Sequence, residues 1–314
     1  MSLKKTIENL VKTTEKSNAE IHEFLIDSGM PCTKRTVRRY ANPIRARLTG
    51  ETKEDLPKIL LFDIETAPME VFVWSLWQKY IGKEAIIKDI SILSWAAKWL
   101  FDPTMMSESV AAEEAANRKD GSVLASIWKL LDAADIVIAH NGAKFDARIL
   151  NTRFALAGYK PPMPYRMIDT LRVARQNFQL SSYSLDYINR LFSLTPKRET
   201  NFELWRRCVG GDERALNEMR EYNEIDVVAL EECYLELRPW IKSHPNVALF
   251  ISTDKEVCTN CGSADLEWRG NYYTPAGRFK AFRCLNPKCG AIGRSRYSDL
   301  TTEERKRLHL SIAR

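Results

Sequence analysis

The sequence predicts an α/β protein with a small helical region before its core and a metal-bound ribbon after it. Three observations support this fold class. Apolar runs such as residues 59–62 and 136–139 have the length of buried strands and end in polar residues. Amphipathic stretches such as residues 123–134 lie between these runs and predict helices. Four of the seven cysteines lie in the last quarter of the chain, in two pairs.

Length and composition limit the possibilities. The 314 residues suffice for one medium domain and one or two small ones, and 45% hydrophobic with 28% charged residues is ordinary for a soluble globular protein. No apolar run approaches the roughly 20 residues that span a bilayer, and the first residues lead into no signal-peptide core. We therefore expect a cytoplasmic protein without a membrane partner, in which Cys32, Cys208 and Cys233 are free thiols.

The net charge of +6 is unevenly distributed. Residues 1–50 carry a net charge of +5, residues 51–250 carry −4, and residues 251–314 carry +5. A mildly acidic centre between basic ends suits a metal-binding core with flanks that bind a polyanion. The alternative is that the basic ends are merely solvated, and the charge distribution alone does not separate the two.

The first predicted strand ends in a pair of carboxylates. Residues 59–62 run directly into Asp63 and Glu65, which point to the same face because side chains alternate along a strand. Two adjacent carboxylates repel each other and lose hydration, which is costly unless a cation neutralises them. Mg²⁺ and Mn²⁺ prefer such oxygen ligands. An ordinary strand that runs into a polar turn is the alternative for this stretch taken alone.

Before this strand, residues 3–48 look helical. Ser17 is a predicted helix N-cap, and a turn at residues 28–29 precedes a basic stretch, residues 34–40, which Thr33 can cap. This order is the outline of a helix-turn-helix. A basic helical hairpin packed on the core is the alternative, and residues 48–57 are the expected linker.

The core alternates strands and helices. We expect Trp74, Trp77, Trp95 and Trp99 to be core or sheet-face residues, with base stacking as the alternative for one or two of them. Residues 103–122 are polar and loop-like. The predicted strands cover the opening run and residues 71–76, 91–100, 135–139 and 166–168, and the predicted helices cover residues 123–134, 146–156, 170–178, 184–193 and 212–238.

The cysteine pairs have the spacing of zinc ligands. Gly262 and Gly290 follow the second cysteine of each pair, and residues 268–283 between the pairs read as a hairpin. Paired knuckles joined by a hairpin are typical of a four-cysteine zinc ribbon with one structural Zn²⁺. Four unrelated thiols would leave the spacing unexplained. The predicted zinc ligands are Cys258, Cys261, Cys284 and Cys289.

Three motifs occur in order: Phe-Asp63-Ile-Glu65-Thr, His-Asn141-x₃-Phe-Asp146 and Tyr222-x₃-Asp226. Together they resemble the DEDD superfamily of 3′–5′ exonucleases, over residues 58–240. The tyrosine four positions before the last aspartate resembles the tyrosine branch of that superfamily.

More narrowly, the chain resembles a phage and prophage family of stand-alone exonuclease-like proteins. That family is related to the proofreading domains of family B DNA polymerases and carries a C-terminal zinc ribbon. The resemblance rests on Phe-Asp-Ile-Glu-Thr-Ala-Pro, Trp-Ala-Ala-Lys-Trp, Ala-His-Asn-Gly, Glu-Tyr-Asn-x₂-Asp-Val and Leu-Arg-Pro-Trp-Ile-Lys-x-His-Pro-Asn, and it does not cover the first fifty residues.

The resemblance implies a ribonuclease H-like mixed five-stranded sheet and two Mg²⁺ or Mn²⁺ ions. Asp63 would bridge the ions, Glu65 and Asp226 would complete the site of the attacking water, and Asp146 would support the second ion. Tyr222 would orient the nucleophile, because a tyrosine with a pKa near 10 is a poor base at neutral pH. The expected domains are a basic helix-turn-helix-like region (1–50), the exonuclease domain (58–245), the zinc ribbon (254–298) and a basic helical tail (299–314).

The implied activity is 3′–5′ exonucleolytic hydrolysis of phosphodiester bonds, on DNA. The alternatives are a ribonuclease D-type exoribonuclease and a non-catalytic nucleic-acid-binding adaptor. Residues 1–50 are the expected surface for any protein partner.

Three residues near the motifs have two possible roles each. Asp169 is interpreted as a helix cap, with a metal role as the alternative. Asn141 fixes a turn or contacts substrate, and Lys144 contacts a phosphate or is solvated. The other predicted substrate-binding residues are Arg35, Arg38, Arg39, Arg269, Tyr272, Tyr273, Lys280 and Arg283.

Overall fold

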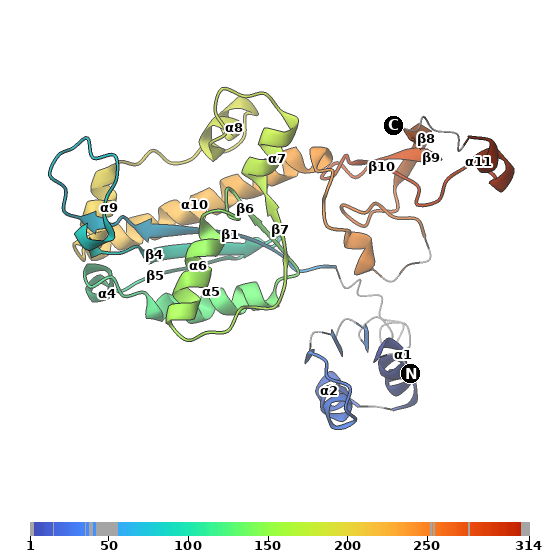
Figure 1. Ribbon diagram of the computed structural model, residues 1–314, viewed down its shortest axis with the longest axis horizontal. Helices are drawn as coiled ribbons and strands as arrows, with labels where there is room; N and C mark the ends of the chain where they lie inside the picture. Colours follow the sequence, from blue (N-terminus) through green and yellow to red (C-terminus); the bar gives the residue numbers. More distant parts are fainter. Residues whose placement is uncertain are drawn as a thin grey trace. The chain divides into compact units, whose positions relative to one another are not determined.

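The computed structural model has two compact units, Lys58–His244 and a second one that consists of Met1–Pro57 and Pro245–Arg314 (Figure 1). Arg35, Arg38 and Arg39 lie outside the described residues, so the predicted basic helix stays a prediction. The described residues are 3–14, 16–34, 36–37, 40–41, 56–251, 253, 255–275 and 277–308.

The N-terminal segment begins with two helices, α1 (Leu3–Thr13) and α2 (Asn18–Asp27). The predicted N-cap of α2 is confirmed: the Ser17 hydroxyl accepts from the backbone of Glu20, whose carboxylate accepts from the Ser17 N–H. Such a capping box satisfies two otherwise unpaired helix donors. The buried apolar residues of both helices pack with two residues that follow them, Val37 and Ala41, and this small core consists of Ile7, Val11, Ile21, Leu25, Val37 and Ala41.

The central sheet has five strands in the order β5-β4-β1-β6-β7. Strand β1 lies in the middle, antiparallel to β4 and parallel to β6, which confirms the predicted mixed five-stranded sheet. A central strand is fixed by ladders on both sides, so the residues at its end are held firmly. The strands are β1 (Ile59–Ala67), β4 (Ser91–Trp99), β5 (Met105–Ser109), β6 (Ile136–Ala139) and β7 (Arg166–Asp169).

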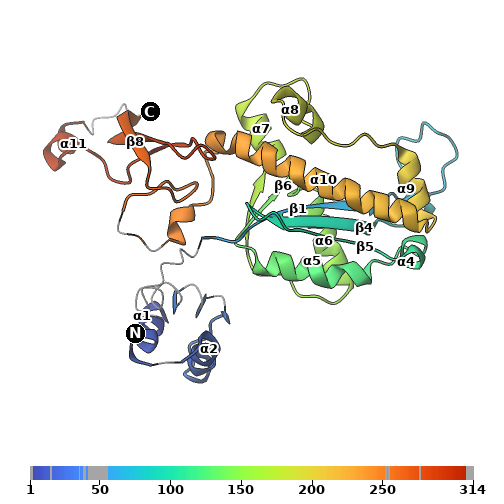
Figure 2. The same cartoon turned by 180° about the vertical axis from the view of Figure 1, so that it is seen from behind.

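Helices cover both faces of this sheet. Figures 1 and 2 show α10 (Glu213–Leu237) across one face, and α5 (Gly121–Ala133) and α6 (Asp146–Leu156) on the other. The buried face of α10 packs on β1 and β4. The remaining helices of this unit are α4 (Ala112–Ala116), α7 (Thr170–Asn177), α8 (Leu185–Leu191), α9 (Phe202–Val209), η1 (Lys83–Ala85) and η2 (Arg238–Trp240).

Two parts of the predicted core are wrong. Residues 103–122, predicted as a loop, contain β5 and α4, because a half-buried edge strand needs little apolar character once β4 pairs with it. The strand predicted over residues 71–76 is reduced to β2 (Glu70–Val71), which pairs with β3 (Ile86–Lys88).

The tryptophans that were predicted to lie in the core have different environments in the structure. Trp95 is in the core, where its indole N–H donates to the Val123 carbonyl over 3.0 Å. Trp74 and Trp77 lie on the loop between β2 and β3 and are fully exposed. Their assignment to the core was wrong. Aromatic residues favour strands because a sheet buries their rings, and here strand β2 ends at Val71, before either tryptophan.

The C-terminal segment is built on a three-stranded antiparallel sheet in the order β10-β9-β8. Its Thr301–Glu304 capping box confirms the predicted cap of the tail helix. Among the described residues, no helix combines the length and apolar character that a bilayer crossing requires. The elements are η3 (Val247–Leu249), β8 (Leu266–Thr274), β9 (Gly277–Cys284), β10 (Ile292–Arg294) and α11 (Thr302–Leu308).

Candidate active site and cysteine cluster

The predicted carboxylates meet between the central strand and the long helix. One carboxylate oxygen from each of Asp63, Glu65 and Asp226 lies within 4.8 Å of the others. Asp63 and Glu65 share a face of β1, and Asp226 points from the buried face of α10 with 1% of its surface exposed. Carboxylates that lie up to 163 positions apart in the sequence therefore form one acidic cluster that is suited to a divalent cation.

Asp146 approaches the cluster from the N-terminus of α6. It is 2% exposed, and its Oδ1 accepts from the Ile64 N–H over 3.2 Å, which ties it to β1. The start of a helix favours a negative charge. The structure thus brings all four predicted carboxylates into one region: Asp146 lies outside the group of three, but its charge raises the pKa values of Asp63 and Glu65.

The electrostatics show how crowded these acids are. Burial raises the pKa of Asp63 well above its ordinary value, and the carboxylates of Asp146 and Glu65 raise it further. Burial, with help from Asp226, raises the pKa of Glu65 to about 8 against the effect of Lys197. Burial also raises the pKa of Asp146 to about 6. The raised pKa values of these acids indicate buried, crowded carboxylates whose negative charge divalent metal ions could neutralise.

Lys197 is a residue that the sequence did not reveal. It lies on the segment between α8 and α9, and its Nζ donates to Asp226 Oδ2 over 2.5 Å. The ammonium also lies 5.5 Å from the centre of the Tyr222 ring. Burial lowers the pKa of Lys197, but the carboxylates of Asp226 and Asp63 outweigh this and raise it above its ordinary value. Lys197 is therefore a fixed cation beside the acidic cluster.

Asn223 is a second residue that sequence analysis missed. It is fully buried, and its side-chain amide donates to Asp63 Oδ2 over 2.7 Å. An amide donor holds the carboxylate in one orientation and leaves Asp63 Oδ1 for another partner. A signal was available, because Asn223 adjoins Tyr222 in the third motif and lies one helical turn before Asp226.

Tyr222 lies on the same helix face. It is almost fully buried, and Trp205 packs edge-on against its ring with 6.2 Å between the centroids. Burial and the Asp226 carboxylate raise the pKa of Tyr222 to about 12. A phenol that stays protonated at neutral pH acts as a hydrogen-bond donor, in agreement with the orienting role expected from the sequence.

The loop after β6 holds the second motif. Asn141 adopts a left-handed conformation with φ 65°, and its backbone N–H donates to Asp169 Oδ1 over 3.0 Å. Asp169 also accepts from the Arg172 N–H and begins α7, which confirms its interpretation as a helix cap. Asn141 thus fixes a turn, and Lys144 lies exposed in the same loop. Substrate contacts of both residues stay predictions.

The four cysteines predicted to bind zinc also come together. One sulfur from each lies within 4.8 Å of the others, with Sγ–Sγ distances of 3.8 Å for Cys258–Cys289 and 3.5 Å for Cys261–Cys284. Zn–S bonds of about 2.3 Å in a tetrahedron require sulfurs about 3.8 Å apart. The donor set and its spacing therefore fit one Zn²⁺.

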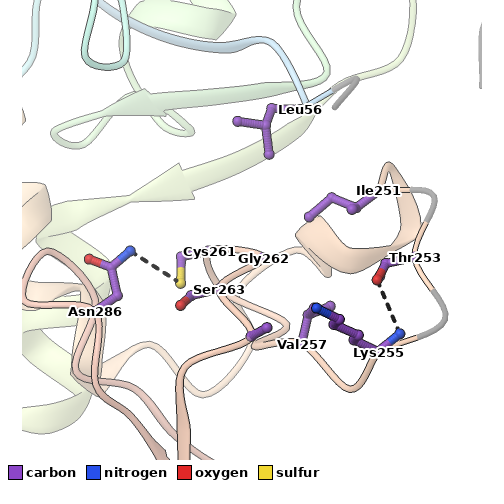
Figure 3. Close-up of a pocket in the computed structure, with 10 residues that line it drawn as sticks. Leu56, Ile251, Thr253, Lys255, Val257, Cys261, Gly262, Ser263 and Asn286 are labelled. Carbon is purple, nitrogen blue, oxygen red and sulfur yellow. Dashed lines mark hydrogen bonds between the residues drawn. The ribbon is translucent and has the colours of Figure 1, made fainter. Parts of the chain in front are cut away.

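The backbone around these cysteines has the form of two metal knuckles. Gly262 (φ 79°) and Gly290 (φ 58°) occupy left-handed positions directly after the second cysteine of each pair. Figure 3 shows the Asn286 amide directed at the Cys261 sulfur, which it reaches over 3.8 Å. A donor to a thiolate stabilises its negative charge and orients it toward a metal.

The predicted ribbon residues lie on two different faces of the hairpin. Residues that pair directly across two strands share a face, and so do residues two apart along one strand. Tyr272 pairs with Phe279, and Arg283 lies on that same face of β9. Arg294, which the sequence did not single out, lies over the rings of Phe279 at 3.9 Å and Tyr272 at 5.6 Å.

The opposite face of the hairpin carries Lys280 and Tyr273, which pair with Asn271 and Arg278. Arg269 lies in the irregular stretch of β8 where the pairing register shifts by one residue. Tyr273, Lys280 and Arg269 are all exposed. One nucleic-acid strand cannot cover both faces of a flat hairpin, so the predicted residues form two alternative surfaces.

The fold and the acidic cluster define the core as a ribonuclease H-like α/β domain. A family model described as the RNase_H superfamily matches residues 103–238, which confirms the predicted fold class. Among solved structures, the family B DNA polymerase from the hyperthermophilic archaeon Pyrobaculum calidifontis is similar to this chain, with 14% sequence identity and a TM-score of 0.42. That match covers 63% of this chain and 27% of the polymerase chain. No curated protein matches the chain.

Proposed function

We propose that this protein is a metal-dependent 3′–5′ exonuclease that hydrolyses phosphodiester bonds at the end of a DNA strand. The observation that carries the proposal is the cluster of three carboxylates within 4.8 Å, with Asp146 held to the same strand through the Ile64 N–H, in a ribonuclease H-like core. The order of the motifs along the chain supports the same reaction. Burial and then the repulsion between neighbouring carboxylates raise the pKa values of these acids, and binding of two Mg²⁺ or Mn²⁺ ions would offset both effects.

Each residue of the site would have a separate role in such a reaction. Asp63, Glu65 and Asp226 would hold the ions, and bound divalent ions lower the pKa of water and stabilise a leaving oxyanion. Asn223 keeps Asp63 in place through the 2.7 Å hydrogen bond. Tyr222 orients the attacking water through its protonated hydroxyl, and the ammonium of Lys197 stabilises negative charge that develops on the phosphate.

The test is incubation of a 5′-labelled single-stranded oligonucleotide with the protein and Mg²⁺ or Mn²⁺. We expect a ladder that shortens from the 3′ end and disappears with EDTA. Asp63→Ala and Asp226→Ala should abolish release, whereas Tyr222→Phe should lower the rate without abolishing it. Glu113→Ala, which removes an exposed carboxylate of α4, is the matched control and should retain the wild-type rate.

Two outcomes would replace the proposal with one of the alternatives. Release from RNA but not from DNA of the same sequence would indicate an exoribonuclease. Metal-independent binding without release from either polymer would indicate a non-catalytic adaptor. Wild-type rates for Asp63→Ala would mean that the acidic cluster is not the active site.

A further inference from the structure

The loop between β2 and β3 exposes an unusual amount of aromatic surface. Trp74 and Trp77 expose 101% and 94% of their reference surface, and Phe72 and Tyr80 expose 76% and 79%. Exposed aromatic residues in such a cluster are costly in water and mark interaction sites. Residues 73–81 contain no helix or strand, and their regular structure is limited to a turn at Leu76–Trp77.

The base of this loop is nevertheless anchored. Glu70 pairs with Lys88, and the Phe72 N–H donates to the Ala85 carbonyl over 2.9 Å. Lys88 also forms an ion pair with Glu70 over 3.4 Å. The pairing of β2 with β3 therefore fixes both ends of the loop that carries the aromatic residues.

The base of this loop lies beside the acidic cluster. Strand β1, which carries Asp63 and Glu65, ends at Ala67, and β2 begins three residues later. Trp74 follows Glu65 by nine residues, a reach of at most about 30 Å for an extended chain. Stacked nucleotides advance about 3.4 Å each. If the 3′ end of a strand lies at the acidic cluster, the loop can therefore reach only bases within about nine nucleotides of that end.

The charges on the loop match such a strand. The loop, residues 72–85, contains two lysines, Lys79 and Lys83, and one glutamate, Glu84, all exposed, so it carries a net charge of +1. Aromatic rings for bases combined with cations for phosphates are the usual surface for single-stranded nucleic acid. Exposed rings together with a net positive charge favour a nucleic-acid strand as the occupant, because its bases can stack on the rings and its phosphates are anionic.

We propose that Trp74 and Trp77 form a stacking platform that holds the bases of a single-stranded substrate a few nucleotides upstream of its 3′ end. The proposal rests on the proposed function for the position of that end. Stacking requires only the π-face of a base, so the platform accepts any sequence and both DNA and RNA. It would keep the shortening strand bound between successive cuts.

The test compares an intact 12-nucleotide strand with one that carries abasic sites at nucleotides three to eight from its 3′ end. Both strands have the same backbone charge, and only the intact strand offers bases to the loop. Binding is measured with the Asp63→Ala protein, and we expect the intact strand to bind at least about fivefold more tightly for each base that stacks. Trp74→Ala with Trp77→Ala should remove this preference, and Trp74→Phe with Trp77→Phe should restore most of it.

The controls separate this role from folding and from the reaction. Leu156→Ala removes a 72% exposed apolar side chain at the end of α6 and should keep the preference for the intact strand. Quenching of tryptophan fluorescence by the intact strand should be lost in the double phenylalanine variant. DNA and RNA strands of the same sequence are tested in parallel, because the platform should bind both.

The outcomes are distinct. An unchanged preference for the intact strand after the double alanine substitution would overturn the proposal. If light scattering then showed dimers that the same substitution dissociates, the loop would join two copies of the chain instead. If the wild-type protein released no nucleotides but the tryptophans still determined the preference, the proposed exonuclease function would fail and the stacking platform would stand.

Discussion

The substitution Glu65→Gln tests how much a buried, ionised carboxylate of the acidic cluster destabilises the metal-free protein. In the metal-free protein, burial and the Asp226 carboxylate raise the pKa of Glu65 from 4.5 to about 8, although Lys197 lowers it. The folded chain then holds this proton more tightly than the unfolded chain does. The free energy of unfolding therefore falls as the pH rises from about 4.5 to 8. The Glu65→Gln variant should not show this fall, because glutamine does not ionise.

The magnitude follows from the size of the shift. One pKa unit corresponds to about 1.4 kcal/mol, so the full shift of Glu65 corresponds to about 5 kcal/mol. Because Glu65 is partly exposed and water screens its charge, we expect about 3 kcal/mol. For a core of this length, 1 kcal/mol changes the melting temperature by roughly 2–4 °C. At pH 8.5 the variant should therefore melt about 6–12 °C above the wild type.

The assay is thermal denaturation with EDTA at pH 5 and pH 8.5. At pH 5 the wild-type carboxyl is largely protonated, so the two proteins should melt at nearly the same temperature. Saturating Mn²⁺ should raise the melting temperature of the wild type more than that of the variant, which has lost a proposed ligand. A difference between the proteins that is equal at both pH values would refute the reasoning.

Three further predictions concern the other parts of the chain. Lys197→Met should destabilise the metal-free protein by about 1–3 kcal/mol, since it leaves the buried Asp226 without its cation, and the loss should shrink at saturating Mn²⁺; an equal loss with and without metal would contradict this. The purified protein should contain one zinc per chain by elemental analysis and Cys289→Ser clearly less, whereas a zinc-free wild type would exclude the ribbon site. Deletion of residues 1–50 should weaken binding of long DNA and flatten the slope of log affinity against log salt, and an unchanged slope would favour a protein partner for that segment.

Much of the acidic cluster could be predicted from the sequence because local patterns encode it. Asp63 and Glu65 follow an apolar run, and Tyr222 and Asp226 share a helical face, so each pair is placed by the periodicity of one element. The motif order then links elements that are far apart in the chain. The cysteine pairs are likewise legible, because metal coordination constrains their spacing.

The features that were missed depend on tertiary structure. Lys197 lies in a polar segment without periodicity, and only the folded chain shows that it contacts Asp226. Strand β5 owes its existence to pairing with β4, not to its composition. Trp74 and Trp77 have the propensity of strand residues, but no neighbouring strand covers them.

The contact between Lys197 and Asp226 has a consequence for folding that is independent of the proposed reaction. A site that depends wholly on divalent ions for its positive charge would leave four crowded acids whenever those ions became scarce. Here one ammonium from the chain itself remains in place and offsets part of that repulsion. More of the protein should then stay folded when Mg²⁺ or Mn²⁺ becomes scarce than if the chain supplied no cation at this position.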